Sequence, residues 1–533
     1  MRLRTLLPSI LACSLSCRGG EIAEVLPSLP EDDPAIPFLE RLDGTEGCRL
    51  PDRRPWPGET VLACLDAFLV RSEDQTDSVF AARLRRRLDL RGTVDAGWGT
   101  RPAWSQEREG RTDRLFLDLG AEGHLVSSSD SDRVSGILGG RLRPRVEVLL
   151  GDRLALWSRP FQLTEVSDRA RWTKSMDPGK GEYQTALFAQ PGEAAPARTV
   201  DGLEGGIEAR LVGVRVRSGL LRTTWGSLPE PLMFSGRTGA MPLTEVAAEV
   251  GPIEASVLGA RLVGETFDEL RYLYGHRLRW RGANWSVAWS EAAISVGRGL
   301  EPLYLVPVFP MILSEHMLGD PDNRQMDFDG SWRPIPSLEL SAELFLDDLQ
   351  NFLGFFSDGW GNKWALGVGL ELRNFTGRRT LDRLQAARIE PWTGGPSSAV
   401  LPGEESNAPV HFGSPLGSAL GPNSFALSWG RRQDLSERWS WMSSLRAQWK
   451  GAGPGSSASD LNWRDSSGTW VVAHPEKTWL GRLAWTRQIA TTGAELRLGG
   501  QWRGALEVGV EASDAPGERR VWPVFAARVA FRE

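Results

Sequence analysis

The chain has 533 residues, with 62 lysine and arginine residues against 68 aspartate and glutamate residues and a formal net charge of −6. This near balance provides no basic excess for phosphate groups, so nucleic acid is excluded as a partner. The length requires several domains or one large closed architecture. Tryptophan is abundant, with 23 residues beside 59 glycines, and this content indicates a membrane interface.

Residues 1–20 have the pattern of a secretory signal peptide. Two arginines near the N-terminus precede an apolar run at 6–15, and small and polar residues follow. Cys17 leaves a lipoprotein alternative open, although Ser14 occupies the place where a lipidation box usually has leucine. The longest apolar stretch elsewhere, 303–313, is short and contains two prolines. A helical membrane protein is therefore excluded.

Residues 21–90 are predicted to form a small helical head. Shortly after residue 33, a proline at the first helical position and apolar residues at helical spacing predict a first helix. The same spacing recurs at 61–69 and again after Asp77, which predicts a bundle of three short helices. Cys48 and Cys64 lie in a chain that has left the cytosol, so a disulfide between them is chemically allowed. A buried reduced pair is the alternative.

From residue 91 to 533 the hydrophobic period changes to two, and turn residues interrupt the chain at intervals. Phe425, Leu427 and Trp429, for example, alternate with serine and alanine, and the chain returns after a polar turn with alternating tryptophans at 439–449. Such alternation is typical of antiparallel strands with one apolar and one hydrated face.

Strand length and tryptophan position favour a membrane as the apolar solvent. Strands of about 10 residues suit a tilted crossing of a bilayer, and tryptophans fall near strand ends, where an aromatic girdle lies. Residues 91–533 accommodate about 16 to 20 strands with their connections. The predicted fold is therefore mainly β: a large antiparallel transmembrane β-barrel of about 18 strands after a small N-terminal helical head. The segments 375–411 and 451–469 are predicted to be loops.

The order of several short motifs adds a family resemblance. They are Phe38-Leu39-Glu40-Arg41-Leu42, Trp225-Gly226-Ser227-Leu228, Met241-Pro242-Leu243, Leu273-Tyr274-Gly275-His276, Val296-Gly297-Arg298-Gly299-Leu300-Glu301-Pro302, Gly319-Asp320-Pro321-Asp322-Asn323 and Arg333-Pro334-Ile335-Pro336. This order resembles that of the capsule-assembly Wzi family of outer-membrane barrels. The resemblance spans most of residues 36–372, and residues 373–533 match by barrel pattern only.

The resemblance implies a barrel in the cell outer membrane with its helical head at the periplasmic end. It also implies a non-catalytic role, in which the protein helps to attach or organise capsular or surface polysaccharide. The expected partners are outer-membrane lipid, that polysaccharide and, during insertion, the barrel-assembly machinery, and a monomer is expected. A general diffusion porin with an open, watery lumen is the alternative function.

Charged residues on the inferred lumen faces are the candidate site. They are Arg277, Arg279, Arg281, Glu339, Glu343, Asp347 and Glu371. If the leucines near 340–346 face lipid, the acidic residues between them face inward, where an unpaired charge is costly. We therefore expect the three arginines to pair with Glu343, Asp347 and Glu371 and to hold the barrel shut. The alternative is a lining that binds sugar hydroxyls or uronic carboxylates.

Motifs for catalysis or metal binding are missing from the sequence. The five histidines are scattered and accompany no nucleophile elbow, zinc-type histidine pair or phosphate-binding glycine loop. The acidic stretch 320–329 does not have the spacing of a calcium loop, so it is predicted to be a solvated turn. The sequence therefore predicts neither an enzyme nor a cofactor.

Overall fold

The computed structural model describes residues 36–43, 48, 50, 58–71, 81, 85 and most of 104–532. Within the last range, it leaves out 109–110, 131–132, 152, 168–174, 178–181, 188–194, 212, 264–269, 308, 320–321, 350–361, 376–378, 396–406, 412–413, 437, 458–478, 499–501 and 517. The predicted signal peptide and Cys17 lie outside the described residues.

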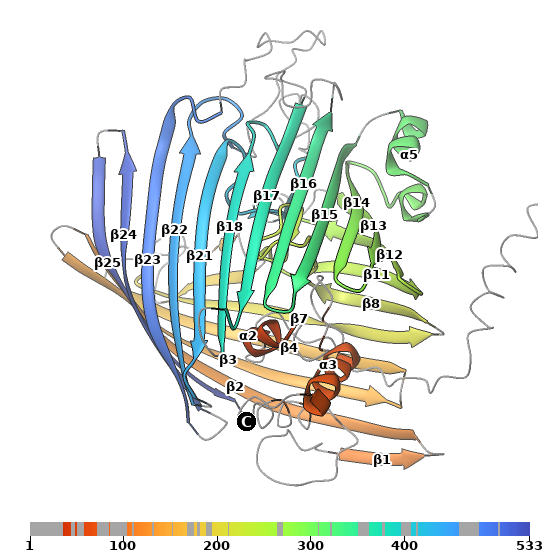
Figure 1. The fold of residues 1–533 in the computed structure, drawn as a ribbon, viewed down its shortest axis with the longest axis horizontal. Coiled ribbons are helices and arrows are strands. Elements are labelled where there is room, and N and C mark those ends of the chain that lie inside the picture. Colours follow the sequence, from red (N-terminus) through yellow and green to blue (C-terminus); the bar gives the residue numbers. More distant parts are fainter. Residues whose placement is uncertain are drawn as a thin grey trace, which may run out of the picture.

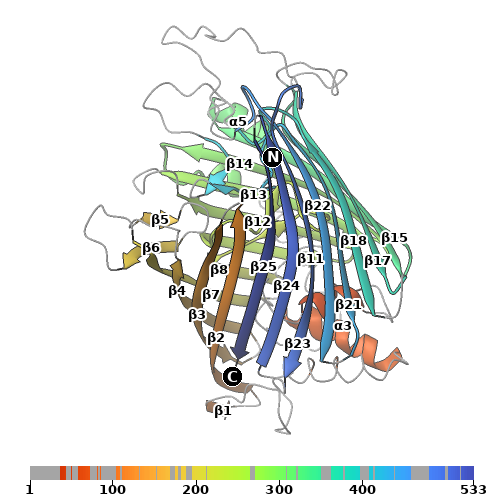
Figure 2. The ribbon, with the colours of Figure 1, turned by 90° about the vertical axis from the view of Figure 1, so that its left-hand side faces the viewer.

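Eighteen strands of the described chain form one closed antiparallel barrel, in which successive wall strands pair and β25 pairs with β2 (Figures 1 and 2). The wall strands are β2 (Arg111–Asp130), β3 (Arg133–Leu150), β4 (Leu154–Ser167), β7 (Ala197–Leu211), β8 (Val214–Leu221), β11 (Met241–Val250), β12 (Ile253–Leu262), β13 (Arg271–Arg281), β14 (Trp285–Val296), β15 (Asn323–Ile335), β16 (Leu338–Leu349), β17 (Asn362–Arg373), β18 (Thr380–Ile389), β21 (Ser424–Asp434), β22 (Trp439–Gly451), β23 (Leu483–Leu498), β24 (Trp502–Ala515) and β25 (Glu518–Arg532). The predicted fold class and strand number are confirmed.

The remaining elements are short and lie before the barrel or in its connections. They are α2 (Ile36–Leu42), α3 (Gly58–Arg71), β1 (Trp104–Arg108), β5 (Ser175–Asp177), β6 (Glu182–Leu187), β9 (Thr224–Trp225), β10 (Phe234–Ser235), the 3-10 helix η1 (Pro302–Leu305), α5 (Met311–Leu318), β19 (Val410–His411) and β20 (Ser414–Pro415). None of the described helices is long and apolar enough to span a membrane.

The two ends of the barrel differ in their connections. At one end, which we call the turn end, short turns join the strands, such as 251–252 between β11 and β12 and 336–337 between β15 and β16. The first residue of β2 and the last residue of β25 also lie at the turn end, since the number of wall strands is even. At the other end, the loop end, most connections are long, as at 297–322, 390–423 and 452–482, although β2–β3 and β24–β25 are joined by two residues each.

Two predictions about loops need correction. The segment 375–411 is not a single loop, because β18 runs from Thr380 to Ile389 through it and the long connection begins at residue 390. The acidic stretch 320–329 is not a solvated turn, because β15 begins at Asn323 and buries Asp327 and Asp329. Both errors have one cause: the wall strands carry polar residues on their inward face, so charge density alone does not mark a loop.

The strands alternate between an apolar outer face and a polar inner face. In β16, Leu340 is 39% exposed, whereas Glu343 is 1% exposed, so Glu343 faces inward as predicted. Exposed outward tryptophans gather at the turn end, where Trp280 is 55% and Trp332 51% exposed, and Trp439 and Trp441 begin β22 there. An apolar outer band with a tryptophan girdle is typical of barrels that span a membrane.

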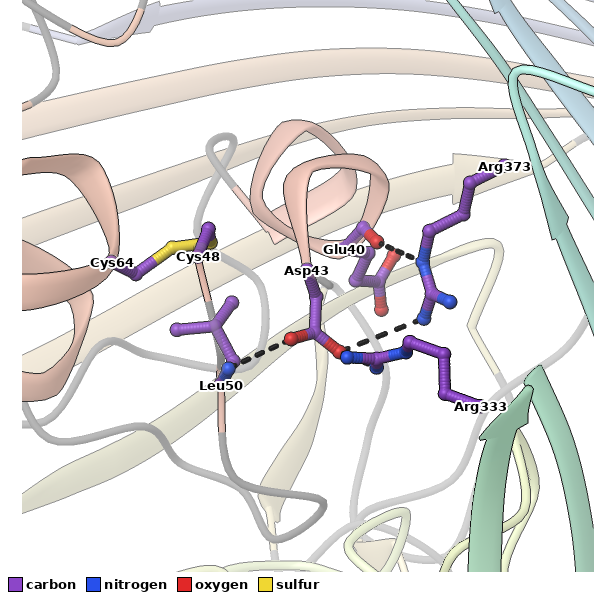
Figure 3. Close-up of a disulfide and its surroundings, with 7 residues drawn as sticks. All are labelled: Glu40, Asp43, Cys48, Leu50, Cys64, Arg333 and Arg373. Atoms are coloured by element: carbon purple, nitrogen blue, oxygen red, sulfur yellow. Dashed lines mark hydrogen bonds and ion pairs between the residues drawn. A yellow bond between two sulfur atoms is a disulfide. The ribbon is translucent and has the colours of Figure 1, made fainter. Parts of the chain in front are cut away.

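The described part of the head contains α2 and α3. Phe38 and Leu39 of α2 and Leu65 and Phe68 of α3 belong to one buried apolar cluster, which also contains the two cysteines 48 and 64. The structure joins those cysteines by a disulfide (Figure 3). The head is thus a small unit with its own core, and its acidic and basic side chains remain available for contacts with the barrel.

Candidate functional site

The lumen holds a polypeptide segment of its own. The connection between β8 and β11 (222–240), which we call the lumen loop, leaves the wall and forms the two-stranded ribbon of β9 and β10. Trp225, Leu228 and Phe234 of the loop are buried in the main apolar cluster together with inward residues of the wall. Residues 225–228 stand out in the sequence as a motif, but nothing in the sequence indicates that they lie in the lumen.

Glycines of the wall make room for this loop. A Cβ atom at Gly275 of β13 would lie 2.9 Å from the ring of Trp225, and Leu228 fills the space over Gly367 and Gly369 of β17. Larger residues at these positions would displace the apolar side of the loop.

Polar bonds tie the lumen loop to four wall strands. Glu343 of β16 accepts the backbone amides of Leu232 and Met233 through Oε1, at 2.7 and 3.1 Å. Arg446 of β22 donates two bonds of 3.0 Å to the carboxylate of Glu230. Gln385 of β18 forms two bonds of 2.9 Å with the backbone of the same glutamate. A serine of the loop, Ser227, donates to an aspartate of β15. The loop is therefore held at both its apolar and its polar side.

The predicted arginines of β13 lie on the inner face, but their pairing differs from the prediction. Arg277 donates bonds of 2.6 and 3.0 Å to Asp329 and one of 2.8 Å to Ser290, and it does not form the expected pair with Glu343. Both Arg277 and Asp329 have side chains that are 1% exposed. The strand register explains the difference, because β13 lies next to β14 and two strands from β15, while Asp329 is directly opposite Glu343.

The other two arginines of β13 face carboxylates on β11 and β12. Arg279 lies 3.9 Å from Glu254, and both are buried. Arg281, at the turn end, lies 3.3 Å from Glu249. The alternation in the sequence correctly predicts that these side chains face the lumen. Their partners are carboxylates on the adjacent strand β12 and the next strand β11, and not those on β16 or β17.

Glu339 and Glu371 belong to a separate cluster at the turn end, where the head contacts the barrel. Figure 3 shows Arg333 and Arg373 of this cluster beside Glu40 and Asp43 of the head. Arg333 contacts Asp43 of the head at 2.7 Å, and Arg373 contacts both Glu339 at 2.9 Å and Glu371 at 3.1 Å.

Further contacts join the head to the turn end of the barrel. Arg373 also donates a bond of 3.1 Å to the backbone carbonyl of Glu40, and Arg383 lies 2.9 Å from the carboxylate of the same residue. Arg41 lies 3.3 Å from Asp434. The sequence alone does not indicate that these head residues contact the barrel, because the two partners of each contact are separated by hundreds of positions in the chain.

Asp347 lies toward the loop end and holds a second connection over the mouth of the barrel. We call the connection between β18 and β21 (390–423) the mouth loop. Asp347 accepts bonds from Gln325 at 2.9 Å and from the amide of Gly394 at 3.0 Å. Asn323 donates to the carbonyl oxygens of residues 395 and 407 at 3.0 and 2.9 Å. The mouth loop also contacts the lumen loop, since the amide of Ser235 donates to Leu416 at 2.9 Å.

His411 of the mouth loop is buried, and its Nδ1 accepts the amide of Val263 at 3.1 Å. Burial, together with the nearby charges of Arg271 and Arg222, lowers the pKa of His411 to about 4. The imidazole is therefore neutral near pH 7, and the unprotonated nitrogen of a neutral ring can accept this bond.

A different part of the lumen wall exposes its charges. Arg143 of β3 and Arg528 of β25 both pair with Glu122 of β2, at 3.6 and 2.9 Å, and their side chains are 36% and 66% exposed. Arg487 of β23 pairs with Glu511 of β24 and is 44% exposed. We call these residues the open wall. Unlike Arg277 and Glu343, they can reach a molecule that enters the lumen.

Comparison with known proteins identifies the architecture. No family model matches the sequence, and no curated protein matches it either. Among solved structures, the chain is similar to Wzi of Escherichia coli, described as an outer-membrane protein involved in group 1 capsule assembly and a carbohydrate-binding β-barrel, with a TM-score of 0.57. The two are 12% identical, and the match covers 96% of this chain and 99% of Wzi.

More distant matches are outer-membrane proteins of Pseudomonas aeruginosa. OprD is 9% identical with a TM-score of 0.41, and OccK8 (OprE) is 8% identical with a TM-score of 0.44. Each of these two matches covers 79% of this chain.

The match to Wzi shows that the chain has the Wzi fold over nearly its whole length. This is the fold that the motif resemblance predicted.

Proposed function

We propose that this protein is a non-catalytic outer-membrane barrel that binds surface polysaccharide and helps to attach or organise it at the cell surface. The loop end would face the exterior, and the turn end with the helical head would face the periplasm. Short turns and both barrel termini at one end, with long connections at the other, support this orientation.

The observation that carries the proposal is the filled lumen. The head contacts the turn end of the barrel, and the lumen loop crosses the middle of the lumen. The mouth loop forms hydrogen bonds with wall residues near the loop end. A diffusion porin needs a continuous water path, whereas a barrel that anchors a polymer does not. The fold shared with a carbohydrate-binding barrel supports the same class of function.

The open wall is where we place the polysaccharide contact. Of the lumen residues predicted from the sequence, Arg277 and Glu343 are buried and form hydrogen bonds with the wall or the lumen loop. Arg143, Arg487 and Arg528 are exposed and present guanidinium groups, which bind carboxylates and hydroxyls through paired hydrogen bonds. An acidic or hydroxyl-rich polymer fits this chemistry.

Binding of surface polysaccharide extracted from the source strain tests the proposal. The purified full-length protein in detergent should retain the polymer, and Arg143→Gln with Arg528→Gln should weaken retention at least several-fold. Arg281→Gln is the matched control, because it removes a lumen arginine that is 31% exposed from a different part of the wall. Retention that is equal in all three proteins, or absent in the unchanged one, would reject the polysaccharide role.

The open wall also favours a second candidate, the diffusion porin, since its charges border accessible space in the lumen. Planar-bilayer recording separates the two. The closed barrel predicts little conductance from the unchanged protein, and a large steady conductance would favour the porin.

A further inference from the structure

The connection between β14 and β15 (297–322), which we call the outer cap, packs against the outside of the barrel wall. Outward residues of β13 and β14 alternate with inward ones such as Arg277 and Ser290. His276 Nε2 on that outer face is 2.7 Å from the carbonyl oxygen of Tyr304 in η1. Glu291, also outward, accepts the amide of Met311, the first residue of α5, at 2.9 Å. Figure 1 shows α5 beside β14 at the edge of the barrel.

The outer cap covers polar groups that would otherwise face the surroundings of the barrel. Glu291 is 1% and His276 8% exposed, and they are opposite each other on the two strands. The hydroxyl of Tyr274 accepts the amide of Glu301 in the cap at 2.7 Å. On the lipid face of a barrel, a charged side chain is destabilising in proportion to its depth. The cap thus buries these polar side chains of the outer wall and forms hydrogen bonds with them.

Glu315, Tyr304 and Asp322 of the cap direct their polar groups toward the wall or toward one another. Glu315 of α5 contacts Arg324 of β15 at 3.0 Å, and the hydroxyl of Tyr304 donates to Asp322 at 2.7 Å. Tyr304 is fully buried, in one cluster with Tyr274 and Met311.

Apart from His316, the exposed residues of the described part of the cap are apolar residues, glycine or proline. Phe309 is 49%, Leu313 56% and Met317 80% exposed. Leu313 and Met317 are four residues apart in α5 and lie on one face of it, and Phe309 lies just before the helix. We call these three side chains the stripe. On the same outer face, the wall continues toward the turn end with Leu278 at 46% and Phe328 at 44% exposed. The stripe therefore adds exposed apolar side chains to the outer face of the barrel near its loop end.

We propose that the outer cap is a membrane anchor, with Phe309, Leu313 and Met317 inserted among the lipids of the outer leaflet. This inference rests on the outer-membrane placement proposed above. Lipid is the occupant that the structure favours, because the stripe lies on the same outer face of the barrel as the exposed apolar wall residues, and Glu315 and Asp322 of the cap are buried against the wall and η1. The anchor would fix the depth of the barrel on this side.

Spin labelling tests the anchor. The four cysteines of the chain lie in the predicted signal peptide and in the disulfide, so Met317→Cys provides a reactive thiol on the cap. Leu278→Cys on the wall and Ser457→Cys in the exposed connection after β22 are the controls. Each full-length protein carries a nitroxide and is placed in phosphatidylcholine and phosphatidylglycerol vesicles. Collision rates with oxygen, which concentrates in the bilayer, and with a water-soluble nickel complex are then compared.

The anchor predicts that the label at 317 collides with oxygen more than with nickel, as at 278, while the label at 457 shows the reverse. A label at 317 that behaves as at 457 overturns the anchor and leaves the membrane placement standing. A label at 317 that is shielded from both reagents, or broadened by a second label, overturns it in favour of a protein partner or a second copy. Water-like behaviour at 278 rejects the membrane placement and the anchor together.

Discussion

Replacement of Glu343 by alanine tests whether the lumen loop closes the barrel. Glu343 is inside the lumen, and its Oε1 accepts the amides of Leu232 and Met233. Glu343→Ala removes that acceptor while the two amides stay in a buried region. Glu343→Gln is the matched control, since its amide oxygen can still accept both bonds.

The magnitude follows from the two orphaned donors. A buried donor without a partner costs about 1–3 kcal/mol, so the two amides together cost about 2–6 kcal/mol. Removal of a buried carboxylate relieves part of its own desolvation cost, which moves the net effect to the lower end, about 2 kcal/mol. A change of this size raises the population of a displaced loop by a factor of about 30.

Planar-bilayer recording and amide hydrogen exchange measure the displacement. Glu343→Ala should give frequent conducting events and faster exchange at 232 and 233, whereas Glu343→Gln and the unchanged protein should give few events. The amount of protein that reaches the outer membrane should stay the same. If the alanine variant conducts no more than the unchanged protein and its amides exchange equally slowly, Glu343 does not hold the loop and the closure mechanism is rejected.

Three further predictions concern the head and the mouth loop. Cys48→Ser with Cys64→Ser should destabilise the head by about 3 kcal/mol. The head should then be digested faster by protease, while the heat-modifiable gel shift of the barrel stays unchanged. Equal rates of proteolysis with and without the two cysteines would contradict a stabilising disulfide. Asp43→Asn removes a charge that contacts Arg333 of β15 and should weaken the binding of the head to the barrel by about 1.5–3 kcal/mol. In detergent, protease should therefore cleave the head from the barrel faster. An unchanged rate of cleavage would contradict a stabilising role of this contact. Because the pKa of His411 is lowered to about 4 in the folded protein, the unfolded state binds the extra proton first on acidification, so mouth-loop stability should fall as the pH drops from about 6.5 toward 4. Exchange of the Val263 amide, corrected for its intrinsic pH dependence, should therefore accelerate at pH 5 relative to pH 7, and His411→Gln should abolish the difference.

Local periodicity was enough to predict the wall of this protein. Alternation with a period of two determines which face each side chain takes, and it correctly placed Glu343 inward and Leu340 outward. It also predicted the strand number, because strands of membrane-spanning length with their connections occupy a limited range of residues. These properties depend on each segment alone, so the sequence determines them without knowledge of the neighbours.

Contacts between distant segments were decided only by the tertiary structure. The partner of Arg277 depends on the stagger of four strands, which places Asp329 rather than Glu343 within its reach. The lumen loop and the outer cap are both connections at the loop end, yet one enters the barrel and the other covers its outer wall. Their composition does not distinguish these fates, because each carries apolar and charged residues together. The deciding factor is space: glycines open the inner wall beside Trp225, while bonded polar groups on the outer wall, such as Glu291, require a cover.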